Sequence, residues 1–520
     1  MSEPEGSDAP VAEPEESRNP HPIYNWMSGI GVALASVGLS AVLFQIALDL
    51  LVGAHSGYSG LALLPALGLT LVGVGLVVAG WLRERRRQRR GVRSSFFETW
   101  IVDPWGVVRQ HGWWYAPLLI AVVALGLFGA GAGTVGIVEY SESNQFCTET
   151  CHAVMGPEGA TYAEAPHSRI ACVSCHVGAG PEGFFAAKLG GMRQLYALAT
   201  DTVSRPIPTP IHPSHIDREL CESCHAPERD AGIRAWEHAY YPTLDATEPT
   251  RVAMVLTVSD GGIGALGGEG VHYHMQISRK VEYVARDAQR LEIAWVRVTD
   301  ADGATHEYEL DGGELSDDER AALPIRTMQC TDCHSRPAHP FPTATDTVNR
   351  ALDARLLPRD LPSIKEVGVL ALDGDYDDTA AALVGIEESI RSYYEEEEPE
   401  LLTERSEDID EAVDTLQALY QRTIFPEMKA DWRAHPDHSG HLDSPGCFRC
   451  HNDQMLDADG DSPTTECASC HAVIAQDDET IAAMDEFESG RDFVHPEDGG
   501  TFEEFTLCSD CHDGGALLYE

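Results

Sequence analysis

Three long apolar runs, rich in Leu, Val, Ala and Gly, lie near the amino end of the chain. They cover residues 30–51, 61–82 and 116–138. Each run is long enough to cross a bilayer as a helix, which needs about 20 apolar residues. Trp26 and residues 113–115 lie at the edges of these runs, where aromatic side chains favour the membrane–water interface. The pattern predicts a membrane anchor of three helices within residues 26–140.

A basic loop between the second and third runs predicts the orientation of this anchor. The loop covers residues 83–93 with the sequence RERRRQRRGVR, and basic loops of this kind stay on the cytoplasmic side. The amino terminus is then cytoplasmic, and everything after Tyr140 lies on the outer side. Residues 1–25 are rich in Glu, Pro and Ser and predict a disordered acidic tail.

The pattern changes after the anchor. Residues 141–240 show little periodicity. Alternating runs then follow at 252–258, 271–277, 281–285, 291–300 and 306–310 and predict a small β insertion within 241–325. Helical periodicity dominates residues 344–432, with an acidic break at 395–400. Little secondary structure is predicted for residues 433–520.

The charge of the chain is strongly acidic. It has 84 acidic against 36 basic residues, which gives a formal net charge of −48. Nucleic acid is excluded as a partner, because phosphate binding needs a basic face. Two interpretations of the acidic surface stay open: it keeps the protein soluble, or it receives a basic protein partner.

The cysteines carry the most specific chemistry. All fourteen occur in pairs, and a histidine follows each pair directly. Six of the pairs form CxxCH motifs, and the first, CTETCH, has one extra residue. In such a motif both thiols bond to haem vinyl groups and the histidine ligates the iron. Zinc sites also use CxxC, but they do not need a histidine at the next position in every copy. The sequence therefore predicts seven c-type haems.

The predicted haem contacts follow from the motifs. The attachment residues are Cys147, Cys151, Cys172, Cys175, Cys221, Cys224, Cys330, Cys333, Cys447, Cys450, Cys467, Cys470, Cys508 and Cys511. The predicted iron ligands within the motifs are His152, His176, His225, His334, His451, His471 and His512. Residues 141–240 thus form a three-haem domain, residues 326–432 hold the fourth haem and a helical region, and residues 433–520 hold three haems.

A second axial ligand for most irons must come from the twelve histidines outside the motifs and the membrane region. Positions near the motifs favour His167, His212, His274, His339, His441 and His495. His272 and His274 are two residues apart and are expected to share one face of a strand, so that only one of them ligates iron. The less favoured candidates are His215, His238, His306, His435 and His438.

The motifs resemble those of a known family. FCTETCHAVMGPE, APHSRIACVSCH, SRPIPTPIH and CESCH are similar to the NapC/NirT family of membrane-anchored quinol dehydrogenases over residues 116–240. The three apolar runs and seven motifs are most similar to the seven-haem inner-membrane branch, the ImcH-type cytochromes. The resemblance implies oxidation of menaquinol from the menaquinone pool at the outer face of the bacterial cytoplasmic membrane. The electrons would pass to periplasmic cytochromes or to a reductase.

The resemblance also implies roles for residues beside the first haem. Either His152 or Met155 would ligate its iron, and Lys188, Gln194 and Asp201 would contact quinol from a helix along the membrane. Two other functions stay open: an electron-transfer subunit without its own quinol site, and a terminal reductase with an open haem. The predicted fold is a membrane-anchored multihaem c-type cytochrome. Its external domain is mainly α or irregular, packed around haem, with a small β insertion.

Overall fold

The computed structural model describes two units of the chain, residues 1–143 and 144–520. The described residues are 22–23, 25–52, 59–91, 125–126, 129, 133, 136–137, 139–150, 152–177, 180–209, 216–225, 232–241, 249–259, 270–276, 279–477, 491, 493–495, 508–510, 512 and 514–515. The boundary between the units lies close to the predicted end of the anchor.

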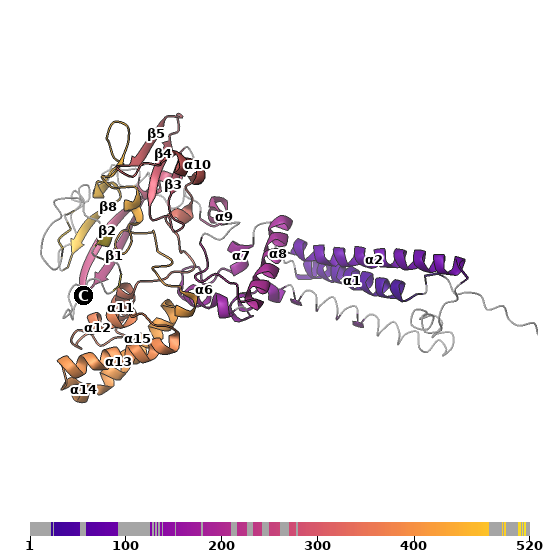
Figure 1. Cartoon of the computed structure of the whole chain (residues 1–520), viewed down its shortest axis with the longest axis horizontal. Helices are drawn as coiled ribbons and strands as arrows, with labels where there is room; N and C mark the ends of the chain where they lie inside the picture. Colours follow the sequence, from indigo (N-terminus) through magenta and orange to yellow (C-terminus); the bar gives the residue numbers. More distant parts are fainter. Residues whose placement is uncertain are drawn as a thin grey trace, which may run out of the picture. The chain divides into compact units, whose positions relative to one another are not determined.

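The first unit contains two long helices, α1 (Trp26–Val52) and α2 (Ser59–Arg89) (Figure 1). Both are long and apolar enough to cross a membrane, by length and composition. They correspond to the first two predicted spans. Helix α2 continues past its apolar part into the basic segment 83–93 and ends there at Arg89. The third predicted span, residues 116–138, lies largely outside the described residues, and its described positions, such as Leu125 and Ile137, are helical.

Glycines let α1 and α2 approach closely. A Cβ atom on Gly31 would lie 2.6 Å from the Gly73 carbonyl oxygen, and one on Gly73 would lie 2.3 Å from the Ala35 backbone nitrogen. Ser28 Oγ donates a hydrogen bond to the Val77 carbonyl at 3.3 Å. Small residues and hydroxyl groups of this kind are typical of contacts between membrane helices. The two helices therefore pack as a specific antiparallel pair.

The second unit begins with four helices that carry or flank the first three haem motifs. They are α6 (His152–Glu164), α7 (Cys172–His176), α8 (Gly180–Ala199) and α9 (Arg218–Glu222). Asp217 caps α9, because its side chain accepts a hydrogen bond from the Leu220 amide at 3.0 Å.

Two antiparallel sheets follow (Figure 1). One has the order β1 (Gly232–Tyr240), β2 (Thr250–Ser259) and β8 (His471–Gln476). The other has the order β6 (Arg326–Thr327), β3 (Lys280–Ala285), β4 (Ile293–Thr299), β5 (Thr305–Leu310) and β7 (Met455–Leu456). Strands β7 and β8 come from the last predicted segment, so the β insertion and the carboxyl-terminal region fold together.

Most of the predicted strands are confirmed, but one is wrong. Residues 271–275 form a 3₁₀ helix, η3 (Val271–Met275), in place of the strand predicted over 271–277. Strand β1 was not predicted, because its exposed middle residues lack a clear apolar alternation.

A helical layer lies on the side of the second unit away from the five-stranded sheet (Figure 1). It contains α11 (Ala344–Asp353), α12 (Ile364–Leu372), α13 (Thr379–Glu397), α14 (Leu401–Glu404) and α15 (Ser406–Thr423). The predicted acidic break is confirmed, because α13 ends within it. Ile386, Ile390 and Tyr394 recur every four residues on α13 and are fully buried against Leu416 and Tyr420 of α15. This layer has an apolar core of its own.

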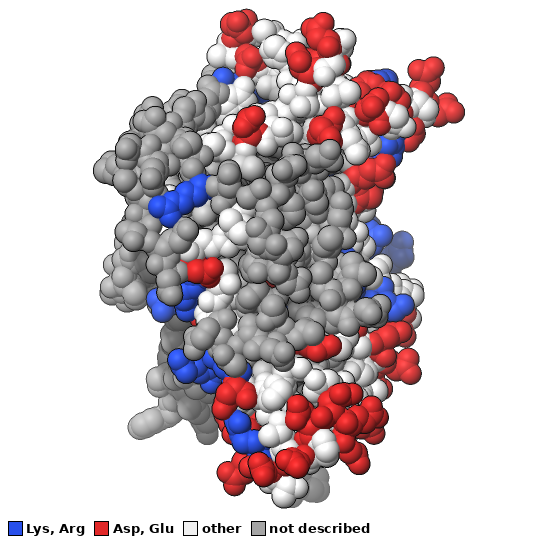
Figure 2. Space-filling model, turned by 90° about the vertical axis from the view of Figure 1, so that its left-hand side faces the viewer, with Lys and Arg blue, Asp and Glu red and all other residues white. Residues whose placement is uncertain are grey.

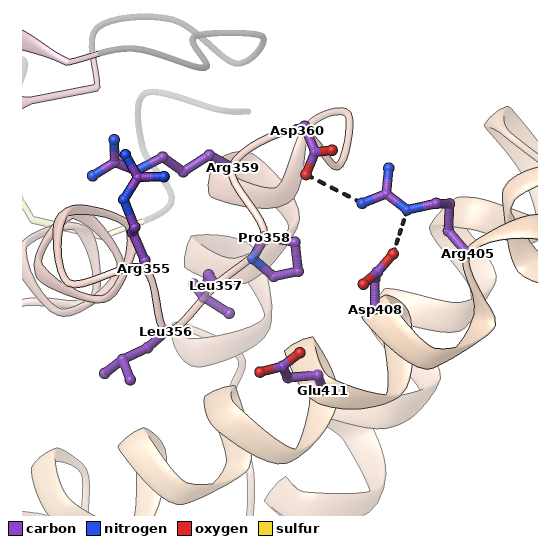
Figure 3. Close-up of a pocket in the computed structure, with 9 residues that line it drawn as sticks. All are labelled: Arg355, Leu356, Leu357, Pro358, Arg359, Asp360, Arg405, Asp408 and Glu411. Carbon is purple, nitrogen blue, oxygen red and sulfur yellow. Dashed lines mark hydrogen bonds and ion pairs between the residues drawn. The ribbon is translucent and has the colours of Figure 1, made fainter.

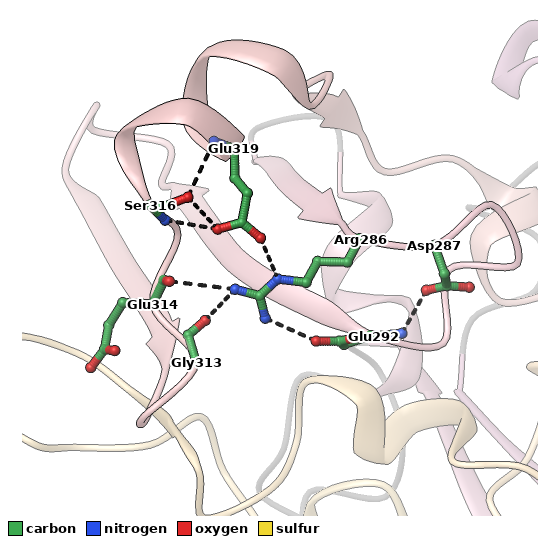
Figure 4. A network of polar contacts seen from close by, with 7 residues as sticks. All are labelled: Arg286, Asp287, Glu292, Gly313, Glu314, Ser316 and Glu319. Carbon is green, nitrogen blue, oxygen red and sulfur yellow. Dashed lines mark hydrogen bonds and ion pairs between the residues drawn. The ribbon is translucent and has the colours of Figure 1, made fainter.

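Arginines join neighbouring elements. Arg405 lies in a surface hollow between the loop before α12 and the start of α15, and it pairs with Asp360 at 3.1 Å and with Asp408 (Figure 3). Arg286, the residue directly after β3, pairs with Glu319 of α10 (Asp317–Ala322) at 3.0 Å and with Glu292 at 2.9 Å (Figure 4). These ion pairs fix α10 on the five-stranded sheet and α15 on the loop before α12.

Candidate functional site

The CxxCH motifs share one backbone turn. In four of them the amide of the motif histidine donates to the carbonyl of the first cysteine: His225 to Cys221 at 2.8 Å, His334 to Cys330 at 2.8 Å, His451 to Cys447 at 3.1 Å and His512 to Cys508 at 2.8 Å. None of the twelve described cysteines forms a disulfide. Their thiols are therefore available for thioether bonds to haem.

The first motif differs in its backbone. Residues Phe146–Thr150 form a π-helix, in which hydrogen bonds join residues five positions apart. A π turn accommodates one residue more than an α turn, and CTETCH has one residue more than CxxCH. The side chain of His152 and all of Cys151 lie outside the described residues. Met155 is half-buried on α6, one turn after His152.

Six motif histidines each lie beside a second histidine. The pairs, with the distances between ring centroids, are His176–His339 at 6.1 Å, His225–His167 at 5.9 Å, His334–His272 at 6.5 Å, His451–His274 at 5.7 Å, His471–His441 at 5.9 Å and His512–His495 at 6.2 Å. Each pair joins one motif histidine to one histidine from elsewhere in the chain.

These distances fit a shared iron. Two imidazoles that ligate one metal ion from opposite sides have ring centres about 6 Å apart, because metal–nitrogen bonds are roughly 2.0 Å long and each ring centre lies about 1.1 Å behind its nitrogen. Direct packing of two rings would not need the same spacing in six places. The six pairs therefore match the donor set of haem with two histidine ligands.

Hydrogen bonds orient several of these rings. Nδ1 of His167 contacts the Pro337 carbonyl at 2.9 Å, and Nδ1 of His339 contacts the Glu158 carbonyl at 2.9 Å. Nδ1 of His451 contacts the Thr464 carbonyl at 2.8 Å. When Nδ1 donates to a carbonyl, Nε2 carries the lone pair that a metal requires.

Burial favours the neutral form of six histidines in these pairs, and the neutral form is the one that ligates iron. It lowers the pKa of His274 and of His339 to about 4. It also lowers the pKa of His176, His441, His451 and His471.

Cysteines of consecutive motifs are neighbours. A hydrogen bond to Cys330, together with burial, raises the pKa of Cys221. Burial raises the pKa of Cys175, and the nearby Cys224 adds to the shift. Burial also raises the pKa of Cys470 to about 11, with Cys447 contributing. Sγ of Cys508, in the seventh motif, lies 3.9 Å from Nδ1 of His441, which pairs with His471 of the sixth motif. The motifs thus follow one another in space as they do in sequence.

The chain is 34% identical over 499 residues to the cytochrome c-type protein ImcH of Geobacter sulfurreducens, and the match covers 95% of this chain and 96% of that protein. The chain belongs to this family of c-type cytochromes. Such cytochromes bind haem covalently and transfer electrons. No protein-family profile matches the chain, and no solved structure matches it.

The three residues predicted to contact quinol do not all lie on one helix of the cytochrome. Gln194 is exposed on α8, and the side chain of Lys188, on the same helix, lies outside the described residues. Asp201 was expected on this helix, but α8 ends at Ala199. Asp201 has a positive φ of 51° and pairs with Arg205 at 2.8 Å. Asp201 therefore follows the helix and does not share a face with Lys188 and Gln194.

Other histidines of the cytochrome lie away from the described motif histidines. His238 stacks on Trp236 of β1 at 5.0 Å, and His306 is exposed on β5. His435 and His438 are buried, His435 beside Arg336 and His438 beside the Gln289 carbonyl. His212, His215 and Cys511 lie outside the described residues.

His272 is the paired residue that sequence reasoning missed. His272 and His274 lie on η3, where three residues complete a turn, so side chains two residues apart point about 120° from each other. On the expected strand both would have pointed the same way. The glycine before this segment, Gly270, was the available signal for a turn.

Proposed function

We propose that this cytochrome oxidises menaquinol at the outer face of the bacterial cytoplasmic membrane and passes the electrons through seven c-type haems to periplasmic acceptors. The observation that carries the proposal is the set of six histidine pairs with the spacing of two iron ligands. Each bound haem supplies one redox-active iron that carries one electron at a time. The paired histidines hold both axial positions, which favours electron transfer over substrate binding at iron.

The contacts between consecutive motifs support an ordered path. The first cysteine of the second motif, Cys172, has a hydrogen bond with Cys147 of the first motif. In each later motif, a cysteine lies near a cysteine or a paired histidine of the motif before it. Electrons that arrive at the first motif would therefore move along the chain toward the last.

The surface of α8 supports a quinol site near the first motif. Leu189, Met192 and Tyr196 recur along this helix with exposed fractions of 67%, 68% and 71%. Apolar side chains at this spacing share one helix face, and an exposed apolar face fits the membrane interface. Lys188 and Gln194 would hydrogen-bond the quinol oxygens. Asp201, beyond the helix end and paired with Arg205, would act as a proton acceptor.

The basic end of α2 supports the proposed orientation. Arg86, Arg87 and Arg89 lie in its last turn. Basic residues at a span end favour the cytoplasmic side, so the haem domain would be periplasmic.

Reconstitution with a menaquinol analogue tests the proposed activity. Purified protein with intact haems should show haem reduction in its absorption spectrum when the analogue is added. K188A and Q194A should each slow this reduction by about tenfold, the effect expected for one lost hydrogen bond of about 1.4 kcal/mol. K280A removes an exposed lysine of the remote strand β3 and serves as the control.

Two outcomes would overturn the proposal. If haem stays oxidised in the intact protein and becomes reduced only after a separate membrane subunit is added, the cytochrome is an electron-transfer subunit. If a high-spin haem binds nitrite and turns it over, the protein is a terminal reductase.

A further inference from the structure

The geometry points to one 3₁₀ turn, Val271–Met275, as the ligand donor for two haems: His272 ligates the iron of the fourth motif and His274 that of the fifth. This inference rests on the proposed haem binding and goes beyond it by assigning both ligands to one turn. The fourth motif contains Cys330, Cys333 and His334, and the fifth contains Cys447, Cys450 and His451.

Ring positions carry the first step. His272 faces His334 at 6.5 Å between centroids with an angle of 74° between ring planes, and His274 faces His451 at 5.7 Å with an angle of 78°. Both distances fit two imidazoles on one iron. Because the 3₁₀ turn separates the two side chains by about 120°, each can point at a different iron.

Hydrogen bonds of the His274–His451 pair indicate which ring nitrogens are free to ligate iron. His274 Nδ1 contacts the Val271 carbonyl at 3.2 Å, and His451 Nδ1 contacts the Thr464 carbonyl at 2.8 Å. A carbonyl oxygen can only accept, so Nδ1 donates in each contact and Nε2 carries the lone pair that a metal requires.

The turn is rigidly held. Gly270 has a φ of +74°, and a Cβ atom there would lie 2.7 Å from the Val258 carbonyl carbon. The Arg279 guanidinium lies 3.8 Å from the centre of the Tyr273 ring and pairs with Asp300 at 3.0 Å. These contacts fix the backbone that separates the two histidines.

The two motifs are joined as well. Arg449, within the fifth motif, donates to the Asp332 carbonyl of the fourth motif at 2.7 Å and to the Arg290 carbonyl at 2.9 Å. Asp332 also pairs with Arg290 and accepts a hydrogen bond from Tyr283 at 2.7 Å. The fourth and fifth haems are thus direct neighbours that share one ligand turn and one arginine bridge.

Paramagnetic resonance of H272A, H274A and the double variant tests this assignment. Each single variant should convert one of the seven haems from low-spin to high-spin, and the double variant should convert two. Added imidazole should restore the low-spin signal. H306A, which removes an exposed histidine of β5, should leave the number of low-spin haems the same as in the wild type.

The assignment is overturned if either single variant contains no more high-spin haem than the wild type, or if one variant converts two haems. Should an alanine variant not accumulate with haem, H272M and H274M keep the position filled, and each should give one haem with the absorption band of a methionine–iron bond. Absence of that band in protein with all haems attached also overturns the assignment. Reduction of the wild-type protein by the menaquinol analogue is measured separately, so a failure of quinol oxidation is distinguishable from a failure of the ligand assignment.

Discussion

Two buried histidines, His435 and His438, are not beside any described motif histidine, yet each is only 2% exposed. Burial, with Arg336 adding to it for His435 and Arg449 for His438, lowers the pKa of each imidazole to about 4. Both side chains are therefore neutral in the folded protein at neutral pH, and charging either one in place would put a cation beside an arginine.

This burial makes the free energy of unfolding depend on pH. Above pH 6.5 the histidines are neutral in both states and have no effect. Between pH 6.5 and about 4 only the unfolded chain takes up the proton, so stability falls as the pH falls. By pH 4 the loss from His438 should reach roughly 3 kcal/mol. H438Q should show a shallower decline in guanidinium unfolding measured across this window.

The exposed His306 provides a matched control, because H306Q should retain the decline of the wild type. Equal declines in H438Q and wild type would contradict the assigned role of His438.

At the scale of single residues, the motif residues could be predicted from the sequence, because CxxCH is a local pattern. His167, His274, His339, His441 and His495 were also named as second ligands, and the structure brings each beside a motif histidine. The partner of each could not be predicted. His167 precedes the second motif in sequence but faces His225 of the third, because tertiary folding decides which rings meet.

At the scale of elements, the turn that carries His272 and His274 depends on Gly270. G270A adds a Cβ atom that would lie 2.8 Å from the Thr257 carbonyl oxygen, on a backbone conformation that disfavours side chains. We expect this variant to displace η3 and to disturb two haems together, visible as two altered low-spin signals in paramagnetic resonance.

G303A is the matched control for this prediction. Gly303 also has a positive φ, 86°, but no atom lies within 4 Å of its added Cβ. The G303A variant therefore has a side chain at a positive φ, as G270A does, but no atom that its Cβ would crowd. The haem signals of G303A should match those of the wild type. Changes of the same size in both variants would mean that strain alone accounts for the effect.

The α13–α15 pair provides a second test at this scale. Leu416 is fully buried in the helical core, and L416A should reduce the free energy of unfolding by about 2–5 kcal/mol. D414A, on the exposed side of the same helix, should change it by less than about 0.5 kcal/mol. Chemical denaturation followed by circular dichroism measures both. An L416A loss below that of D414A would contradict the packing of this core.

Helices and strands with a regular spacing of apolar residues could be predicted from the sequence. Elements whose conformation depends on contacts with distant parts of the chain could not. The helices after Ala344 follow a 3.6-residue period and a clear acidic break. The run 271–277 alternates like a strand, but residues 271–275 form a 3₁₀ turn. Gly270 precedes this turn with a positive φ, and the turn brings His272 and His274 beside two different motif histidines. The pairing of β8 with β2 joins residues too far apart in sequence for a local pattern to indicate.

At the scale of the whole molecule, acidic side chains dominate the charge. Figure 2 shows acidic side chains at both the upper and the lower end of the visible face, and the lower group lies at the height of α13 and α14 in Figure 1. The net charge of −48 should attract a basic acceptor over several Ångströms of solvent.

Electron transfer to a lysine-rich c-type cytochrome should therefore slow as salt rises. Between about 0.01 M and 0.15 M the screening length falls from about 30 Å to about 8 Å, and we expect the bimolecular rate to fall by at least about tenfold. Stopped-flow mixing with the reduced protein measures this rate, and an acidic acceptor serves as the control. A rate to the basic acceptor that does not change with salt would favour the view that the charge serves solubility alone.

The interleaving of the histidine pairs also sets an order of biosynthesis. A ribosome makes the chain from its amino end, so His167 and His225 are both present before translation reaches the fourth motif. The partner of His176 in the second motif is His339, which follows the third and fourth motifs. With the proposed iron ligands, the second haem site would thus be completed later than the third. The enzymes that attach haem would meet it with a single iron ligand, and its iron would gain its second histidine only when a distant part of the newly made chain folds back onto it.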